Sequence, residues 1–316
     1  MFQLIDDGIY RVKSSHGSAG VSNAGYLIID EELAIIDTGL QNTLAQPYLD
    51  TVKAAKRSPM DVKWILLSHA HHDHIGGANL LKIYFPEAKL IAPEVLKDTL
   101  SNPSYHLQKN HFNITRSKRL RLAFRQDPFD NLQKINVDEY YNDADTISLG
   151  EGSLHAISFN GHSIGHSLFF LDRNRVMFSG DALSILPQKQ LNYYIDLTGD
   201  AAGFEKELTF LSRTKINTLC PIHTEPSLKA PSAKSIIQAS LEGFKMMEKQ
   251  ILEGLSKEQT SEQITDKVTK VLNIQWSSPY DLLAREQTII AHLKKLEAEG
   301  KIIKLEKDKK EVYSRR

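Results

Sequence analysis

Within six consecutive positions of this chain, four side chains have the spacing expected of metal ligands. They are His69, His71, Asp73 and His74, and they follow residues 64–67, an apolar Trp-Ile-Leu-Leu segment with strand character. Imidazole nitrogens and carboxylate oxygens suit zinc and its borderline neighbours, and ligands that leave one turn at a strand end converge readily. Four such ligands cannot share one ion with further protein ligands and still leave room for a substrate. The spacing therefore predicts two adjacent metal ions.

The composition is that of an ordinary globular protein without charge bias. The 316 residues are 41% hydrophobic and 25% charged, which allows one large domain and a small one. Lysine plus arginine equal aspartate plus glutamate at 39 each, so no overall field attracts nucleic acid or anionic lipid. No segment approaches the roughly 20 apolar residues of a membrane span, and the amino terminus has no signal-like pattern. With a single cysteine, Cys220, these features predict a cytoplasmic protein without a membrane partner.

Strand and helix signals alternate along most of the chain. Short apolar segments bounded by glycine and polar residues are expected to be strands at 9–12, 25–29, 33–36, 64–67 and 89–92. Helices are expected at about 43–56 and from near Gly77 onward. This alternation predicts an α/β protein, an αββα sandwich of two sheets with helices outside. Ligands at strand ends then fall along one rim.

A polar, aromatic-containing insertion is expected at about residues 93–143. Long insertions between motif loops commonly form a lid or a pocket wall. Two interpretations stay open, a substrate-binding cap and a solvated helical excursion whose charges maintain solubility. Tyr193 and Tyr194 are candidates to hydrogen-bond a substrate oxygen, with simple packing as the alternative.

The last third of the chain changes to a helical pattern. Apolar residues recur at helical spacing from Pro231 onward, and Thr260 begins a capping box, in which side chains bond the free N–H groups of a helix start. A further helix is expected at about 284–300, followed by a strand pair at 301–304 and 311–313. Helix, helix and hairpin in this order indicate a small winged-helix-like domain.

The His-x-His-x-Asp-His pattern resembles the signature of the metallo-β-lactamase superfamily, and further motifs of that family stand in the expected order. Upstream, Ile-Asp-Thr-Gly contains Asp37. Downstream, Gly-His-x-x-Gly-His occupies residues 161–166, an apolar segment ends in Asp181, and another ends in His223. At the last motif relatives more often read Pro-Gly-His-Gly, whereas this chain has Cys-Pro-Ile-His. The resemblance spans roughly residues 25–223.

The resemblance implies a dinuclear site of the glyoxalase II type. One ion would be held by His69, His71 and His162, and the other by Asp73, His74 and His223, with Asp181 bridging. Asp37 and His166 would support these ligands from behind. Two divalent ions are implied, zinc first and iron or manganese as alternatives, with a metal-bridging hydroxide as nucleophile. Asp73 and Asp181 are the carboxylates expected to take part in catalysis.

Histidines outside these motifs show no partner pattern. We interpret His72 as a residue at the rim of the site, and His111 and His292 as surface histidines or buried ones with satisfied hydrogen bonds. His16, in a glycine-rich loop at 14–20, is a further residue that could flank the site.

The C-terminal segment 292–302 looks like the end of the β-lactamase-associated winged helix, a module that follows the hydrolase domain in part of the superfamily. We therefore divide the chain into a catalytic domain, 1–230, and a helical linker with a winged-helix-like domain, 231–316. Residues 256–316 hold 13 lysines and arginines against 10 acids, a weak charge for binding nucleic acid. Packing against the catalytic domain, or a homodimer, is the expected role.

The leading functional hypothesis is a metallohydrolase acting on a small acyl substrate, a thioester first and an ester or lactone second. A thiol leaving group with a pKa of about 8.5 departs without strong help from an acid, and the motifs supply no obvious extra acid. The helical insertion and tail also look like those of the quinolone-signal response thioesterases. Two alternatives stay open: a metal-dependent endoribonuclease on single-stranded RNA, and a regulatory binding protein that retains a metal site.

Overall fold

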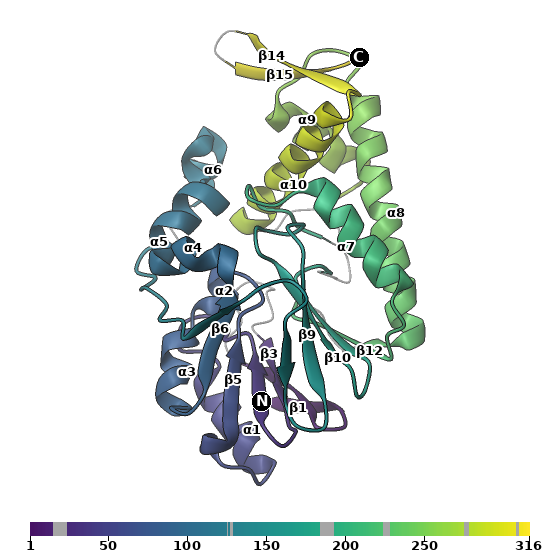
Figure 1. Ribbon diagram of the computed structural model, residues 1–316. Helices are drawn as coiled ribbons and strands as arrows, with labels where there is room; N and C mark the ends of the chain where they lie inside the picture. Colours follow the sequence, from purple (N-terminus) through teal and green to yellow (C-terminus); the bar gives the residue numbers. More distant parts are fainter. Residues whose placement is uncertain are drawn as a thin grey trace.

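Two β-sheets lie face to face with helices on both outer faces, and a helical C-terminal region stands at one end (Figure 1). The computed structural model describes residues 1–14, 24–124, 126, 129–183, 193–223, 228–274, 278–307 and 310–316. The expected αββα sandwich is confirmed. Within the described part of the chain, every helix is too short or too polar to cross a membrane.

The first sheet has seven strands that follow one another in chain order. They are β1 (Phe2–Asp6), β2 (Ile9–Lys13), β3 (Ala24–Ile28), β4 (Leu33–Ile36), β5 (Val62–Leu66), β6 (Lys89–Pro93) and β7 (Glu139–Tyr141). Strands β1 to β4 pair antiparallel, whereas β4 to β7 pair in parallel. Parallel strands end at the same edge of a sheet. Asp37, after β4, and Ser68, after β5, therefore lie together.

The second sheet has six strands in the order β13-β12-β11-β10-β9-β8. They are β8 (Thr146–Ser148), β9 (Ser153–Ser158), β10 (Ser167–Leu171), β11 (Val176–Gly180), β12 (Thr218–Pro221) and β13 (Leu228–Lys229). Strands β11 and β12 are parallel, and the other neighbours are antiparallel. Because their carboxyl ends share an edge, Asp181 after β11 and His223 after β12 leave the sheet close together.

Apolar burial holds the layers together. Between the sheets, the rings of Tyr26 and Phe178 meet edge to face with centroids 5.2 Å apart. The outer faces are covered by α1 (Ala45–Ala54) and α3 (Ala78–Tyr84) on the first sheet and by α7 (Ala201–Arg213) and α8 (Ala230–Gly254) on the second (Figure 1). The sandwich thus holds its strand ends in fixed positions, which is what a preformed site requires.

The insertion between β6 and β7 is helical. Its described elements are a 3-10 turn (Glu94–Leu96), α4 (Lys97–Ser101), α5 (Pro103–His106), a π-helical turn (Leu107–His111), a second 3-10 turn (Ile114–Arg116) and α6 (Lys118–Ala123). Phe112 and Phe129 of the insertion share an apolar cluster with Leu282 and Leu283 of α10 (Pro279–Ala298). The insertion therefore packs against the C-terminal helix and is not a solvated excursion.

The C-terminal elements are α9 (Ser261–Val271), α10 and the hairpin β14 (Ile302–Lys307) and β15 (Lys310–Arg315). The capping box at Thr260 is present. Helix α10 begins at Pro279, earlier than the expected 284, because Ser278 and Asp281 form a second capping box around it. The winged-helix interpretation and the division of the chain at residue 230 stay predictions.

Candidate metal centre

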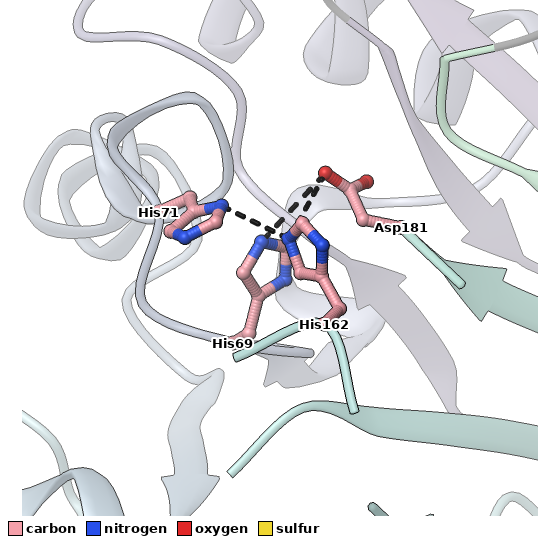
Figure 2. Close-up of side chains that lie close together, drawn as sticks. All are labelled: His69, His71, His162 and Asp181. Atoms are coloured by element: carbon pink, nitrogen blue, oxygen red, sulfur yellow. Dashed lines mark hydrogen bonds and ion pairs between the residues drawn. The ribbon is translucent and has the colours of Figure 1, made fainter. Parts of the chain in front are cut away.

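The seven side chains that the sequence predicts as metal ligands lie at one edge of the sandwich, just beyond the strand ends. They form two groups whose ligand atoms lie within 4.8 Å of one another: His69, His71, His162 and Asp181 in the first, and Asp73, His74 and His223 in the second. Figure 2 shows the first group, in which the Asp181 carboxylate faces the rings of His69 and His162. The structure thus brings all seven predicted ligands together at this edge.

Asp181 stands between the two groups. Its Oδ2 lies 3.5 Å from His162 Nε2 in the first group and 3.1 Å from His223 Nε2 in the second. Its Oδ1 lies 3.2 Å from His74 Nε2. A carboxylate with one group on either side has the position that a bridging ligand requires.

The turn after β5 delivers its histidines through a one-turn helix, α2 (His72–Ile75). His71, the residue before this helix, is extended (φ −64°, ψ 146°), so the chain changes direction at that point. The carbonyl oxygen of His74 accepts hydrogen bonds from the N–H (2.8 Å) and the hydroxyl (2.6 Å) of Thr38. Gly77 follows because a Cβ there would collide with the Thr38 carbonyl oxygen. The loop after β4 thus fixes the ligand turn after β5.

Asp37 holds the second group from behind, as the family resemblance implies. Its Oδ2 accepts hydrogen bonds from His74 Nδ1 and from the Ser68 hydroxyl, both at 2.8 Å, and its Oδ1 accepts the Ser68 N–H at 2.8 Å. His74 Nδ1 is therefore the donor to Asp37, and Nε2 is the nitrogen that faces the centre. Asp37 itself adopts φ 61°, a conformation that aspartate tolerates better than most residues.

His166 supports Asp181 and lies outside both groups. Its Nδ1 donates to Glu207 Oε1 (2.9 Å), and its Nε2 accepts the backbone N–H of Asp181 (3.1 Å). Both ring nitrogens are engaged, so the ring cannot also bind a metal. Glu207, which the sequence did not single out, fixes this orientation from α7.

The two candidate tyrosines point in different directions. Tyr193 is 3% exposed, and its hydroxyl bonds His292 Nε2 (2.8 Å) inside the core under α7 and α8. Its expected role in binding substrate is therefore corrected to a packing role, because its polar atom is already engaged away from the metal ligands. The ring of Tyr194 stacks against His71 with centroids 5.8 Å apart, and its hydroxyl donates to Gln287. His292 is a buried histidine with a partner, as interpreted.

Two imidazole nitrogens of the first group face each other with no proton to share. His162 donates its Nδ1 proton to the Tyr194 carbonyl oxygen (2.7 Å), and His71 directs Nε2 at Asp196 Oδ2 (2.9 Å). Because a neutral imidazole carries one proton, His162 Nε2 and His71 Nδ1, 3.0 Å apart, both present lone pairs. A cation between them would remove their repulsion. His69 Nε2 adds a buried nitrogen without a hydrogen-bond partner among the described residues, so this group fits a metal ion.

Burial and neighbouring charge set the protonation of the ligands. Burial holds the pKa of His69 well below its ordinary value and lowers the pKa of His162 to about 3, so both rings are neutral, as a metal ligand must be. Burial also disfavours charge on His74, but nearby carboxylates, Asp181 first, raise its pKa well above the usual range. For Asp73, burial is outweighed by the neighbouring imidazoles, which lower its pKa to about 2. The ionised Asp73, with Asp181 also beside His223, favours a divalent cation in the second group.

Asp196 and His111 are buried polar residues of this site that the sequence did not reveal. Asp196 Oδ2 accepts from His71 Nε2 (2.9 Å) and from His111 Nδ1 (2.7 Å), so His111 is a partner of the site and not a satisfied histidine elsewhere. His71 and His111 lie 125 and 85 residues from Asp196 in the sequence, too far for any spacing pattern to link them. His16 lies outside the described residues.

Aromatic side chains cover one side of the ligand turn. His72, expected at the rim, stacks on Tyr280 of α10 (centroids 6.1 Å apart) and meets Phe129 of the insertion edge to face (5.3 Å). Phe112 lies against both His71 (4.9 Å) and Phe129 (4.3 Å). The insertion and α10 together thus form an aromatic wall beside the first group.

The family model described as Metallo-beta-lactamase superfamily matches residues 17–223. Hydroxyacylglutathione hydrolase of Bdellovibrio bacteriovorus is 27% identical over 139 residues, 44% of this chain and 40% of that protein. Hydroxyacylglutathione hydrolase of Prochlorococcus marinus strain NATL1A is 28% identical over 205 residues, 62% of this chain and 66% of that protein. The chain thus spans less than two thirds of the length of these relatives.

Two solved structures match nearly the whole chain. A metallo-beta-lactamase family protein from Thermus thermophilus has a TM-score of 0.75 and 18% identity, covering 98% of this chain and 99% of that one. A beta-lactamase domain protein from Burkholderia ambifaria also has a TM-score of 0.75, with 14% identity, covering 100% of this chain and 93% of that one. At this identity the likeness concerns the fold, including the C-terminal helical region.

Proposed function

The chain belongs to the metallo-beta-lactamase superfamily, and on this premise we propose that it is a dinuclear-metal hydrolase of small acyl thioesters, with esters or lactones as second substrates. The observation that carries the proposal is the complete set of ligands, with Asp181 placed between the two groups. A site that had lost its chemistry would be free to lose any of these side chains.

The residues present would hold two divalent ions. His69, His71 and His162 would hold one ion, and Asp73, His74 and His223 the other, with Asp181 between them. Imidazole and carboxylate donors suit zinc first, with iron and manganese as alternatives. Such ions would lower the pKa of water toward neutrality and polarise the acyl oxygen. Asp37, His166 and the Tyr194 carbonyl keep the ligand rings and the Asp181 backbone oriented for this chemistry.

A thioester substrate is consistent with the weak proton donor that lies beside the ligands. The hydroxyl of Tyr194, whose ring packs on His71, is committed to Gln287, and burial raises its pKa well above the ordinary value. It is therefore a poor proton donor to a leaving group. A thiolate needs little protonation, because the pKa of a thiol is about 8.5. The relatives named hydroxyacylglutathione hydrolase point to the same class of substrate.

The aromatic wall favours a small apolar acyl group over a polymer. Phe112, Phe129 and Tyr280 pack beside His71 and His72, so the surroundings of the ligand turn on this side are apolar, which suits a small molecule. Single-stranded RNA would instead need a continuous basic track.

Two arginines of the insertion are neutralised by ion pairs with the C-terminal region. Arg116 pairs with Glu286 of α10 (3.1 Å), and Arg119 pairs with Asp266 of α9 (2.6 Å). These ion pairs fasten the insertion to the C-terminal region and leave less positive charge for RNA. The endoribonuclease is therefore the second choice, and the regulatory protein the third.

The test is a hydrolysis panel with the zinc-loaded full chain: an acyl-glutathione, an acyl-CoA, a lactone, a bis-phosphodiester and a short RNA. We expect turnover of at least one thioester and its loss in Asp181→Asn, which removes the charge between the two groups. Asp172→Asn, on an exposed turn beyond β10, is the matched control and should retain activity. RNA cleavage with inert thioesters would reverse the order, and an inert panel with full metal loading would favour the regulatory alternative.

A further inference from the structure

A buried carboxylate outside the ligand set joins a ligand to the insertion. Asp196 is 1% exposed, and both its oxygens are engaged. Oδ2 accepts from His71 Nε2 (2.9 Å) and His111 Nδ1 (2.7 Å). Oδ1 accepts from the N–H and hydroxyl of Thr198 (2.8 and 2.7 Å) and from the N–H of Gly199 (2.9 Å). Five donors converge on this carboxylate, so its position is fixed.

Asp196 determines which nitrogen His71 presents to the centre. Because the carboxylate accepts a hydrogen bond from the N–H at Nε2 of His71, the lone pair of His71 Nδ1 is directed toward His162 and His69. Without this acceptor the ring would be free to carry its proton on Nδ1, where it would block metal binding. Burial opposes the charge on Asp196, but His111 and His71 outweigh it and hold its pKa well below the ordinary value.

A ring of contacts connects this carboxylate to α10. Gln287 of α10 donates from Nε2 to the carbonyl oxygens of His111 (2.8 Å) and Phe112 (2.9 Å), and its Oε1 accepts the Tyr194 hydroxyl. Tyr194 closes the ring, because its carbonyl oxygen accepts the His162 proton and its ring stacks on His71. The insertion, residues 194–198 and α10 therefore meet around two ligands of the first group.

We infer that Asp196 and His111 are positioning residues of the metal centre. They orient His71, so that its affinity for metal depends on how the insertion and α10 pack beside it. This inference rests on the proposed dinuclear site. The same three side chains also lie close enough to hold an ion of their own. Distances of 2.7 and 2.9 Å are those of charge-assisted hydrogen bonds, and a second ion would require His71 to lose both its ring protons.

The experiment compares zinc binding by the full-length wild type and four variants, using competition with a chromophoric chelator. Asp196→Asn keeps the shape and removes the charge, and His111→Leu removes the N–H donor. His111→Asn restores a donor near the Nδ1 position. Asp200→Asn is the matched control, because Asp200 lies four residues away and accepts the backbone N–H groups of Ala202 and Gly203 that start α7. Circular dichroism confirms that each variant is folded.

We expect Asp196→Asn and His111→Leu to weaken binding of one of two zinc ions by about tenfold to a hundredfold. His111→Asn should recover most of this loss, and Asp200→Asn should bind like the wild type. Long-range proton–nitrogen NMR of the zinc-loaded wild type should show the His71 proton on Nε2. Unchanged affinity in Asp196→Asn, or loss of a third zinc equivalent, would overturn the inference. A wild type that binds no zinc would instead overturn the proposed function.

Discussion

Asp181 reaches the middle of the site because the residue before it is glycine. Gly180 has φ +46°, in the left-handed region, and a Cβ on it would lie 2.6 Å from His166 Nε2. That nitrogen accepts the N–H of Asp181, so any displacement of His166 shifts the backbone of the ligand. Glu207 holds the other side of the His166 ring and leaves it little room to move.

We expect Gly180→Ala to lower kcat/KM at least about tenfold and the free energy of unfolding by about 1–3 kcal/mol. The strained backbone and the clash with His166 act together. Gly254→Ala is the matched control, because its Cβ would only touch Lys267 at 3.6 Å. That change should leave activity intact and raise stability by up to about 1 kcal/mol. Steady-state kinetics and urea unfolding measure both, and a fully active Gly180→Ala enzyme would refute the role of this residue.

Tyr193→Phe tests the corrected role of Tyr193. Removing the hydroxyl leaves His292 Nε2 without its donor in the core, which should cost about 0.5–1.5 kcal/mol of stability. Because the hydroxyl does not face the ligands, kcat/KM should stay within about twofold of the wild type, a difference comparable to experimental error. A large rise in KM without loss of stability would restore Tyr193 as a substrate-binding residue.

The ligands were predictable from the sequence because each lies in a short motif at a strand end. Asp196 and His111 were not, because only the tertiary fold brings two segments 85 residues apart into hydrogen-bond contact. The two neighbouring tyrosines show the same limit. Consecutive side chains point to different sides of the chain, and without the packing of α7, α8 and α10 the sequence cannot say which side faces the ligands.

At the scale of elements, α10 is held from both ends. Its first turns pack Leu282 and Leu283 into the insertion. Near its last turn, Lys295 is paired with Glu248 of α8 (2.7 Å) and Glu205 of α7 (3.2 Å). The apolar spacing alone indicates a helix from about residue 284, whereas the capping box at Ser278 sets the actual start at Pro279.

Glu248 makes the docking of α10 sensitive to acid. Burial would raise its pKa, but His292 and Lys295 outweigh this and lower it to about 2, from an ordinary 4.5. A carboxyl group whose pKa is lower in the folded state contributes stability that is fully present above pH 4.5 and lost as pH falls toward 2, because the unfolded chain binds the proton first.

We therefore expect the stability difference between the wild type and Glu248→Gln to shrink from about pH 6 to about pH 3. Urea unfolding at each pH measures this difference. Glu242→Gln, which is also on α8 and lies beside Gln238, is the control and should show no such change. An equal difference for Glu248→Gln at both pH values would contradict the assigned ion pair.

At the scale of the whole molecule, the ligands come from both sheets. Four of them, at positions 69–74, follow β5 of the first sheet. The other three, His162, Asp181 and His223, follow strands of the second sheet. Bound metal would therefore join the two halves of the sandwich, and only the folded chain would bind it tightly. The alternation of strands and helices was enough to predict this layered fold, whereas the packing of α10 on the insertion depends on tertiary contacts that no local pattern encodes.

Chelation should accordingly destabilise the whole chain. Binding to the folded state alone stabilises it by about 2.7 kcal/mol when the free ligand is at about 100 times its Kd. We expect the melting temperature to fall when a chelator removes zinc and to recover when zinc is restored, with His223→Ala showing a smaller shift. If the melting temperature is the same with and without the chelator, no metal bridges the two sheets.

The most direct test of the account is anomalous diffraction at the zinc edge from crystals of the zinc-loaded full chain. The account predicts two peaks on either side of the Asp181 carboxylate, one beside His69, His71 and His162 and one beside Asp73, His74 and His223. A single peak, no peak, or a peak between His111 and Asp196 would contradict it.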